Sequence, residues 1–521
     1  MTNRLAALSL AMLSTIASAQ TATIHPPESA ISRIRDLERD SSQIVSFAQP
    51  LFDSIGPRLT GSPNLRSAQA YIIARYAAWG IGAKVEDYGT WRSWLRGPTH
   101  VDLIAPRVRS LEAIMLAWSP GTGGKDVEGE VVAMPAFTTP ADFQSFLATA
   151  KGKFVLVSIA QPTCRPDTTW AVNATAATYA KMKAARALTD SNFAQNLRAA
   201  GVAVRDLPDS LERAGALGAF RNTWSGGWGV DRIFGARTKT MPLIDASCED
   251  FGLMARLAMN GQHPRVRVNA TSAFQGEVPV GNVIATIPGG AKKDEYVMLS
   301  SHFDSWDGSS GATDNGTGTI VMMEAMRILR IVLPHPKRTI ISGHWSGEEE
   351  GLIGSRAYAA DHQAIVNTMQ ALFNQDNGTG HVAQVGLQGL TGAEPFFRRW
   401  FAEMPDSVTA GIHIQAPGAP GRGGTDNASF ICYGAPAFGL GSTNWDYFTY
   451  TWHTNRDTYD KIVWDEVHKN ATLVAMLAYL ASEDDATMPR DKVELKDPKT
   501  GAAVAWPECT EPLRNSSLYA R

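Results

Sequence analysis

The chain has 521 residues, of which 44% are hydrophobic and 19% are charged, and its formal net charge is −3. This length is enough for two or three domains whose cores need no stapling by disulfides or metals. A nearly balanced charge argues against a nucleic-acid or other polyanionic partner. The function therefore has to be found in particular motifs.

The first nineteen residues have the pattern of an export signal. Arg4 provides a positive start, residues 5–16 are mostly apolar, and the small residues 17–19 fit a cleavage site. The apolar segment is too short for a membrane span, and no later stretch is long and apolar enough. The residue directly after the expected cleavage site is Gln20 and not a cysteine, which argues against a lipid anchor. We expect a signal peptide over residues 1–19 and an exported protein, periplasmic or extracellular.

The four cysteines are too scattered for a Cys-x-x-Cys zinc site; they are Cys164, Cys248, Cys432 and Cys509. In an oxidising compartment, cysteines usually form disulfides. Three pairings are open, and the sequence does not decide among them. We expect Cys164 with Cys248 and Cys432 with Cys509, because this pairing keeps each bridge within one domain.

The N-terminal part of the mature chain is predicted to be helical. Residues 31–48 carry apolar side chains at helical spacing, and so do residues 68–79, with Gly80 as a stop. A turn-rich loop over residues 53–63 separates the two patterns. We assign residues 20–96 to the N-terminal part of the main domain.

The pattern of predicted secondary structure changes over residues 97–275. Short β-rich runs broken by Gly and Pro surround a helical pair at about residues 171–214. Few His or acidic residues here have the spacing of metal ligands. We predict an inserted domain that acts as a lid or shapes a substrate surface, and we do not expect catalysis to reside in it.

From Gly281 onward, apolar strands alternate with helical segments. Strands are predicted at residues 282–287, 296–300, 339–345 and 369–375, and helices at residues 319–330, from residue 355, and at residues 464–482. This alternation predicts an α/β fold with a largely parallel sheet and helices on both faces. The main domain would span residues 276–490, followed by a C-terminal tail over residues 491–521 that wraps the surface.

Most of the chain's candidate functional residues fall at the ends of these strands or in the loops that follow. They are His302, Asp304, Asp314, Glu348, Glu349, Asp376, His453 and Asp457. Open α/β sheets bind their ligands beyond the carboxyl ends of the strands. We therefore expect these side chains to converge on one edge of one sheet.

Five of these residues suit a pair of divalent ions: His302, Asp314, Glu349, Asp376 and His453. Imidazole and carboxylate ligands are compatible with zinc. Two ions about 3.5–4 Å apart need a bridging ligand, and Asp314, alone in its glycine-rich loop, is the natural bridge. Each ion would keep an open position for a shared water, as catalytic sites do.

The remaining candidates have supporting roles. Glu348 is not needed as a ligand, and as a neighbour of Glu349 it would face the shared water as the general base. Asp304 would orient the imidazole of His302, and Asp457 would do the same for His453. The alternative for residues 348–350 is an acidic helix start favoured by the helix dipole. Trp452 is a candidate for lining a substrate pocket.

At these residues the chain resembles the M28 family of zinc peptidases. The matching motifs are His302-Phe303-Asp304-Ser305, Gly311-Ala312-Thr313-Asp314-Asn315, the run from Glu348 to Ser355, Asp376, and His453-Thr454-Asn455-Arg456-Asp457-Thr458. The resemblance extends from about Asp53 to the end of the chain. Ser305-Trp306-Asp307 and residues 336–339 look most like the carboxypeptidase Q branch, and the insertion looks like a protease-associated (PA) domain.

The resemblance implies a zinc exopeptidase, or phosphorylase/hydrolase-like, fold with a mostly parallel mixed sheet flanked by helices. It implies two Zn²⁺ per chain, one held by His302, Asp314 and Asp376 and the other by Asp314, Glu349 and His453. A cis peptide after Asp314 is implied as well. The implied reaction is the hydrolysis of dipeptides or short peptides by a water that bridges the ions, with Glu348 as base. Homodimers are common among such relatives.

The chain departs from the family at one stretch. Some family members have a Tyr before a Ser-Asp-His run that stabilises the oxyanion, but residues 422–427 here contain neither Tyr nor His. Arg422 or a backbone donor would take over this role.

Two rival functions remain open at the level of the sequence. A glutaminyl-cyclase-like acyltransferase with one zinc shares the fold and most ligands, and Trp452 before His453 fits it. The acidic run at residues 348–355 and the PA-like insertion argue against it. A non-catalytic binding scaffold would have lost metal ligands, and none is missing here. Which end of a peptide is recognised is not determined by these motifs.

Overall fold

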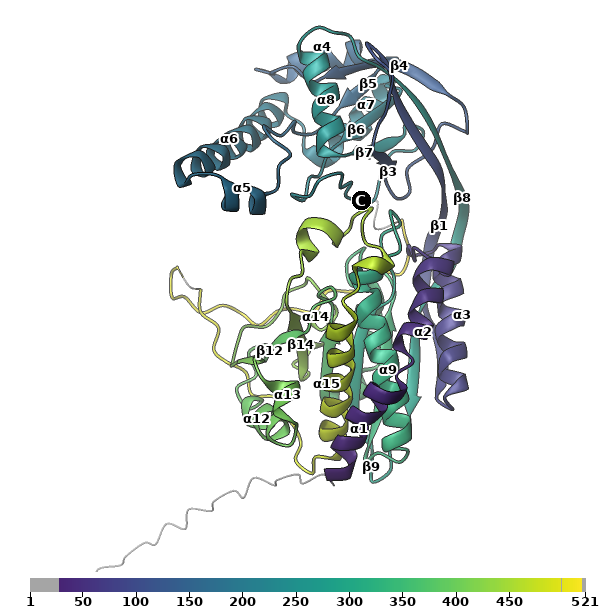
Figure 1. Ribbon diagram of the computed structural model, residues 1–521, viewed down its shortest axis with the longest axis vertical. Helices are drawn as coiled ribbons and strands as arrows, with labels where there is room; N and C mark the ends of the chain where they lie inside the picture. The colour runs from purple at the N-terminus through teal and green to yellow at the C-terminus, as the bar shows by residue number, and fades with distance from the viewer. Residues whose placement is uncertain (1–27, 498, 518–521) are drawn as a thin grey trace, which may run out of the picture.

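The computed structural model describes residues 28–497 and 499–517, so the expected signal peptide over residues 1–19 lies outside the described residues. Figure 1 shows a larger body below and a smaller upper lobe. The long strands β1 (Gly82–Ala105) and β8 (Arg265–Ile287) run between them as an antiparallel pair. In the described part of the chain, no helix combines the length and the apolar character needed to cross a membrane.

The body is built on a mixed sheet with the strand order β13-β12-β14-β11-β9-β10-β8, and β1 pairs with β8. Strands β14, β11, β9 and β10 are parallel, whereas β8 and β12 are antiparallel to their neighbours β10 and β14. The predicted mostly parallel mixed sheet is therefore confirmed. The further strands are β9 (Lys292–His302), β10 (Arg338–Trp345), β11 (Met369–Gln375), β12 (Val382–Gly386), β13 (His413–Gln415) and β14 (Ala437–Ser442).

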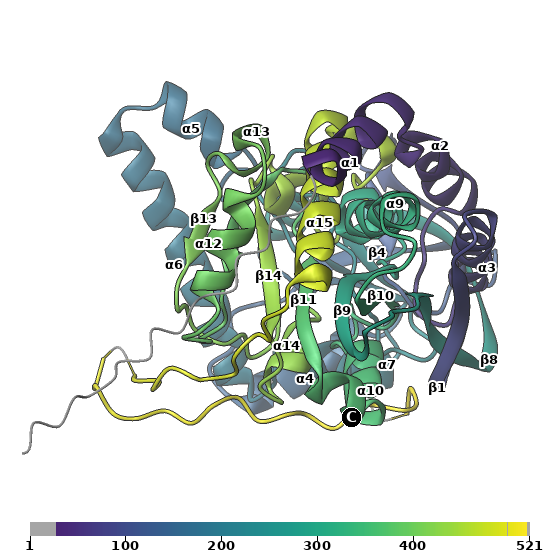
Figure 2. The same ribbon diagram turned by 90° about the horizontal axis from the view of Figure 1, so that it is seen from below.

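Helices cover both faces of this sheet (Figure 2). One face packs against α1 (Glu28–Ser41), α2 (Ile44–Gln49), α3 (Pro63–Ala78), α9 (Thr317–Val332), α12 (Glu394–Ala402) and α15 (Trp464–Glu483). The other face packs against α10 (Ile353–Asp361), α11 (Gln363–Asn367) and α14 (Ala428–Ile431). The short helix α13 (Asp406–Thr409) lies in the connection between α12 and β13.

The two-sided core follows from the alternation of side chains along each strand. In β9, Val297 and Leu299 belong to the apolar cluster with α9 and α15, while Met298 between them belongs to the cluster with α10 and α14. All residues of β10 and β11 are buried, as expected of parallel strands covered on both faces. The predicted strand at residues 369–375 has the bounds of β11.

The upper lobe contains a second sheet segment with the order β4-β5-β6-β7-β3, in which β4, β5, β6 and β7 are parallel. Its strands are β2 (Arg109–Ser110), β3 (Ala113–Met115), β4 (Val127–Ala133), β5 (Phe154–Leu156), β6 (Gly218–Arg221) and β7 (Leu243–Ala246). Its helices are α4 (Pro140–Ala150), α5 (Asp167–Asn173), α6 (Ala176–Ala200), α7 (Leu207–Ala214) and α8 (Cys248–Met259). The helical region predicted at about residues 171–214 corresponds to α5, α6 and α7.

Two elements differ from the sequence prediction. The helix expected over residues 31–48 is broken between α1 and α2, because the backbone N–H of Gln43 donates to Glu324 of α9 instead of continuing the helix. The strand expected at residues 282–287 is only the end of β8, and its partner β1 was not predicted. These two long strands stabilise each other across a large sequence separation, which short-range patterns do not reveal.

Both expected disulfides are present, Cys164–Cys248 in the upper lobe and Cys432–Cys509 in the body. The second joins α14 to the C-terminal tail. The tail wraps the surface as predicted: the Trp506 indole donates to the carbonyl of Ile431 at 2.9 Å, and Arg514 pairs with Asp361 at 2.8 Å.

Candidate active site

The candidate site lies at the carboxyl ends of the parallel strands, on the side of the body that faces the upper lobe (Figure 1). His302 is the last residue of β9, and Asp376 follows β11 directly. Glu348 and Glu349 are in the loop after β10, Asp314 is in the turn before α9, and His453 is in the loop before α15. The predicted convergence on one sheet edge is confirmed.

The structure brings the five predicted ligands together in two groups. His302, Asp314 and Asp376 form one, and Asp314, Glu349 and His453 form the other, with the donor atoms of each group within 4.8 Å of one another. Asp314 belongs to both groups through different oxygens. Its Oδ1 is 3.6 Å from Nε2 of His302, and its Oδ2 is 3.3 Å from Nε2 of His453.

The distances within each group are short. Nε2 of His302 is 3.2 Å from Oδ1 of Asp376, and Nε2 of His453 is 2.9 Å from Oε2 of Glu349. Oδ2 of Asp314 and Oε1 of Glu349 are buried and accept no hydrogen bond from the described residues. Buried carboxylates left without partners are costly unless a cation compensates them. The donor set and these orphaned oxygens therefore fit divalent cations.

Burial dominates the electrostatics of the site. It raises the pKa of Glu348 and of Glu349 well above the ordinary value. Burial also lowers the pKa of His453 to about 4, so its imidazole is neutral at physiological pH, the form that binds metals. For His302, burial is opposed by the charges of Asp376 and Glu348, and the pKa is raised well above its usual range.

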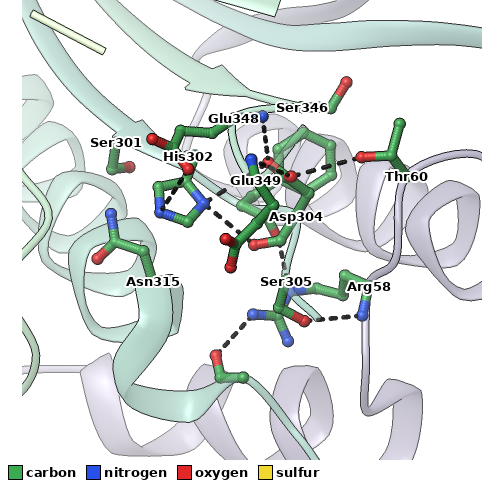
Figure 3. Close-up of polar contacts among 12 residues, drawn as sticks. Arg58, Thr60, Ser301, His302, Asp304, Ser305, Asn315, Ser346, Glu348 and Glu349 are labelled. Carbon is green, nitrogen blue, oxygen red and sulfur yellow. Dashed lines mark hydrogen bonds and ion pairs between the residues drawn. The ribbon is translucent and has the colours of Figure 1, made fainter. Parts of the chain in front are cut away.

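Asp304 connects His302 to the loop of the two glutamates (Figure 3). Its backbone carbonyl is 3.2 Å and its Oδ1 3.6 Å from Nδ1 of His302, so the closer contact with the ring is made by the main chain. Its carboxylate accepts the backbone N–H groups of Glu348 and Glu349, both at 3.3 Å. The hydroxyl of Thr60 is 3.4 Å from Oδ2. Asp304 thus positions three candidate site residues at once.

Asp457 has a different role from the one predicted. Its carboxylate accepts the backbone N–H groups of Thr313 and Asp314, at 2.7 and 2.9 Å, and not the ring of His453. Nδ1 of His453 has no hydrogen-bond partner among the described residues. The amides of this tight turn lack helical partners, so the carboxylate satisfies them and fixes the residue that both groups share. Burial raises the pKa of Asp457 to about 7. The peptide bond between Asp314 and Asn315 is cis, as the family resemblance implied.

The upper lobe reaches the His453 loop directly. The backbone N–H of Ile233 donates to the carbonyl of His453 at 2.7 Å. The ring of Phe234 meets the His453 imidazole edge-on at a centroid distance of 5.0 Å, and Trp452 stacks on it at 3.9 Å. Catalytic residues were not expected in the insertion, and none of the five ligands comes from it, but it does pack around one of them.

A cavity of about 420 Å³ opens over the two groups. It is lined by Asp314, Glu348, Glu349, Gly351, Leu352, Arg356, Asp376, Asn377, Gly423, Gly424, Tyr447, Phe448, Trp452 and His453. Trp452 therefore lines the pocket as predicted. Arg422 does not: it is exposed, and its guanidinium donates to the carbonyl of Ala505, because the glycines that follow turn the chain away from it.

Tyr447 and Arg356 are among the lining residues that were not predicted from the sequence. Burial favours the neutral acid at Asp314, but the neighbouring imidazoles of His302 and His453 lower the pKa of this carboxyl. The aromatic cluster at residues 445–452 just before His453 was the signal for Tyr447. No sequence pattern indicated Arg356, since an Arg in a helix is usually solvated.

Comparison with known proteins agrees with this arrangement. Residues 282–478, which contain all five predicted ligands and Glu348, match the model of peptidase family M28. Carboxypeptidase Q of Mus musculus is 25% identical over 441 residues, which cover 84% of this chain and 86% of that protein. Carboxypeptidase Q of Homo sapiens is 25% identical over 446 residues, with 84% and 85% covered.

Solved structures share the fold. A peptidase M28 precursor from Shewanella amazonensis SB2B has a TM-score of 0.66 at 21% identity, with 89% of this chain and 98% of that chain covered. BSAP, a zinc aminopeptidase from Bacillus subtilis, has a TM-score of 0.56 at 18% identity, with 87% and 97% covered. Over residues 282–478, the part that carries the candidate site, the chain is therefore similar to peptidase family M28.

Proposed function

We propose that this peptidase is an exported dizinc exopeptidase that hydrolyses dipeptides or short peptides, with Glu348 as general base. The observation that carries the proposal is the sharing of Asp314 between two groups of metal-type ligands, with Glu348 beside them. The disulfides Cys164–Cys248 and Cys432–Cys509 support export, because such bonds persist in oxidising compartments.

His302, Asp314 and Asp376 would hold one Zn²⁺, and Asp314, Glu349 and His453 the other. When bound, the ions would polarise the peptide carbonyl and make water a stronger nucleophile at neutral pH. The neutral imidazole of His453 and the orphaned oxygens of Asp314 and Glu349 are suited to this set.

Glu348 supplies the proton transfer in this proposal. It lines the cavity but belongs to neither ligand group, and its Oε2 is 3.9 Å from Nε2 of His302. Its backbone is held by Asp304. A carboxylate of raised pKa takes a proton from water and then gives it to the leaving amine more readily than an ordinary one.

Other side chains would bind and orient the substrate. Trp452 and Phe448 provide an aromatic wall for an apolar side chain of the peptide. Burial raises the pKa of Tyr447 well above its usual range, so its hydroxyl stays protonated and can donate to a developing oxyanion. We further propose that residues 97–275 form a PA-like inserted domain that shapes this cavity, the placement of Phe234 being its support.

The test combines metal analysis with hydrolysis assays. The purified chain, loaded with zinc, is measured for metal content and assayed on dipeptides with small, large apolar, acidic and basic side chains. We expect about two zinc ions per chain, and hydrolysis that Glu348→Gln reduces by at least about 1,000-fold while the metal content stays unchanged.

Glu494→Gln, at an exposed glutamate that pairs with Lys496, is the matched control and should behave as the unmodified chain. One zinc without hydrolysis would favour the cyclase-like alternative, and no zinc would leave only a scaffold. Full activity of Glu348→Gln would remove this residue from the base role.

A further inference from the structure

Arg356 is a cation of the cavity wall that the proposed reaction does not use. It lies in the first turns of α10 (Ile353–Asp361), is half-buried, and lines the cavity together with Glu348. Within the described ranges, its guanidinium neither donates a hydrogen bond nor has a carboxylate within the 4 Å of an ion pair. The donors of this half-buried guanidinium are therefore left to solvent or to a ligand.

Two other arginines of this chain have a structural guanidinium and can be compared with Arg356. Arg58 is fully buried and donates to the carbonyls of Gly56, Phe303, Ser310 and Gly311. Arg338 is fully buried and bonds to Glu295 and to carbonyls at the end of α15. By comparison, Arg356 makes none of these bonds, and its donors are available to an anion bound in the cavity that it lines.

The charged residues that line the cavity indicate which charged group of a ligand could bind there. All of its lining residues are described, and Arg356 is the one Lys or Arg side chain among them. The acidic lining residues are Asp314, Glu348, Glu349 and Asp376, and all four are assigned to metal binding or proton transfer. No acidic side chain of the lining is left over to receive an ammonium group.

The position of Arg356 is fixed relative to the reacting groups. A single turn joins it to Glu348 and Glu349: Leu352, at a φ of 60°, redirects the chain into α10, and the backbone N–H of Arg356 donates to the carbonyl of Leu352 at 3.0 Å. Burial lowers the pKa of Arg356, but Asp426 and Glu348 oppose this, and a guanidinium stays charged at any physiological pH. Gly423 and Gly424 line the same cavity and are exposed, and a Cβ built on either would meet no atom within 4 Å. A bound group can therefore approach.

We propose that Arg356 binds the C-terminal carboxylate of a short peptide, so that substrates are recognised by their free carboxyl end. This inference rests on the proposed peptidase function of the same site. A bidentate guanidinium–carboxylate pair is among the strongest hydrogen-bonded contacts in proteins and would place the last peptide bond over the two ligand groups.

The test compares the dipeptide that the zinc-loaded chain hydrolyses fastest with the C-terminal amide of that dipeptide. We expect the free acid to be preferred, and Arg356→Gln to raise its KM by about 10- to 100-fold with kcat little changed. The KM of the amide should change by less than about twofold, and Arg356→Lys should restore part of the preference. Arg398→Gln is the control, since it removes one exposed positive charge from α12.

Binding is measured separately by calorimetry on zinc-loaded Glu348→Gln, with and without Arg356→Gln, using the same two ligands. Tighter binding of the acid that disappears with Arg356→Gln supports the proposal. Equal binding of acid and amide overturns it, and so does an equal loss of kcat on both, which would mean that Arg356 acts on Glu348. If the unmodified chain hydrolyses none of the dipeptides, the proposed function fails. Calorimetry with the same dipeptides and their C-terminal amides would still measure whether Arg356 favours a free carboxylate.

Discussion

The carboxylate of Asp457 fixes the backbone of Asp314, accepting its N–H at 2.9 Å and that of the preceding Thr313 at 2.7 Å. Since Asp314 belongs to both ligand groups, a residue that touches neither proposed metal position controls both of them. Removing a carboxylate that orients metal ligands typically costs 10- to 100-fold in metal affinity.

Asp457→Asn replaces one acceptor oxygen by an amide nitrogen that cannot accept the second N–H. We expect zinc to bind about 10- to 100-fold more weakly, with both ions affected, as measured by competition with a chromophoric chelator. Asp294→Asn, at an exposed position, is the control. Loss of only the His453-containing site would contradict this role and restore the one predicted from the sequence.

Arg58, drawn in Figure 3, also fixes the glycine-rich loop, at the residues just before the Asp314 turn. Its guanidinium satisfies four backbone carbonyls, two of which, those of Ser310 and Gly311, precede the Asp314 turn. Arg58→Ala leaves these acceptors unsatisfied, so we expect a loss of at least about 3 kcal/mol in the free energy of unfolding. Urea unfolding measures this loss, with the exposed Arg66→Ala as the comparison. A change below about 1 kcal/mol would show that water replaces the guanidinium.

Much of the catalytic body could be predicted because its signals are local. Continuous apolar runs such as β11 mark buried parallel strands, and the position of Asp376 after β11 follows from that assignment. Four of the five ligands were found for the same reason, since all except His453 follow a predicted strand or precede a predicted helix.

The rest depends on contacts between residues far apart in the sequence. The pairing of β1 with β8, the bond of Gln43 to Glu324 and the approach of Phe234 to His453 leave no periodic pattern. The predicted contact of Asp457 with His453 was wrong because residues that are close in sequence need not be close in space. The free guanidinium of Arg356 is visible only once its surroundings are folded.

Tyr447 is a neutral O–H donor of the cavity wall. If its hydroxyl stabilises charge that develops only in the transition state, Tyr447→Phe should lower kcat by about 100-fold with little change in KM. Steady-state kinetics on the preferred dipeptide measure both constants, and the exposed Tyr433→Phe controls for the loss of a hydroxyl. An unchanged kcat would leave the backbone of Gly423 and Gly424 as the donors.

His344 gives the body a pH dependence that is separate from the candidate site. Its ring is fully buried in β10, with Nε2 at 2.7 Å from the Tyr76 hydroxyl, and burial lowers its pKa from 6.5 to about 3. As the pH falls, the unfolded chain therefore binds a proton at this imidazole before the folded chain does. The stability that the neutral, buried ring contributes is complete above about pH 6.5 and is lost as the pH falls towards 3.

Between pH 6.5 and 4.5, we expect the free energy of unfolding of the metal-free chain to fall by about 2 kcal/mol more than that of His344→Gln. Well below pH 6.5 each pH unit is worth about 1.4 kcal/mol, and near pH 6.5 it is worth about half of that. Urea unfolding in the presence of a chelator measures the difference at the two pH values. His335→Gln, at an exposed histidine, should follow the unmodified chain. Parallel pH profiles for His344→Gln and the unmodified chain would mean that the buried ring is already protonated.

Phe234 tests whether the upper lobe supports the His453 position. Its ring packs edge-on against the imidazole at 5.0 Å and also meets Trp306 at 5.6 Å, while the adjacent Ile233 N–H holds the His453 carbonyl. Phe234→Ala removes the packing but keeps this hydrogen bond, so the imidazole becomes less well oriented. We expect the affinity for the zinc held by Asp314, Glu349 and His453 to fall selectively by about 10-fold, with kcat reduced to a similar extent.

Phe274→Ala, at an exposed phenylalanine of β8, is the control. Stepwise zinc titration resolves the two ions: equal weakening of both would point to general destabilisation, whereas unchanged binding and kcat would limit the upper lobe to shaping the cavity.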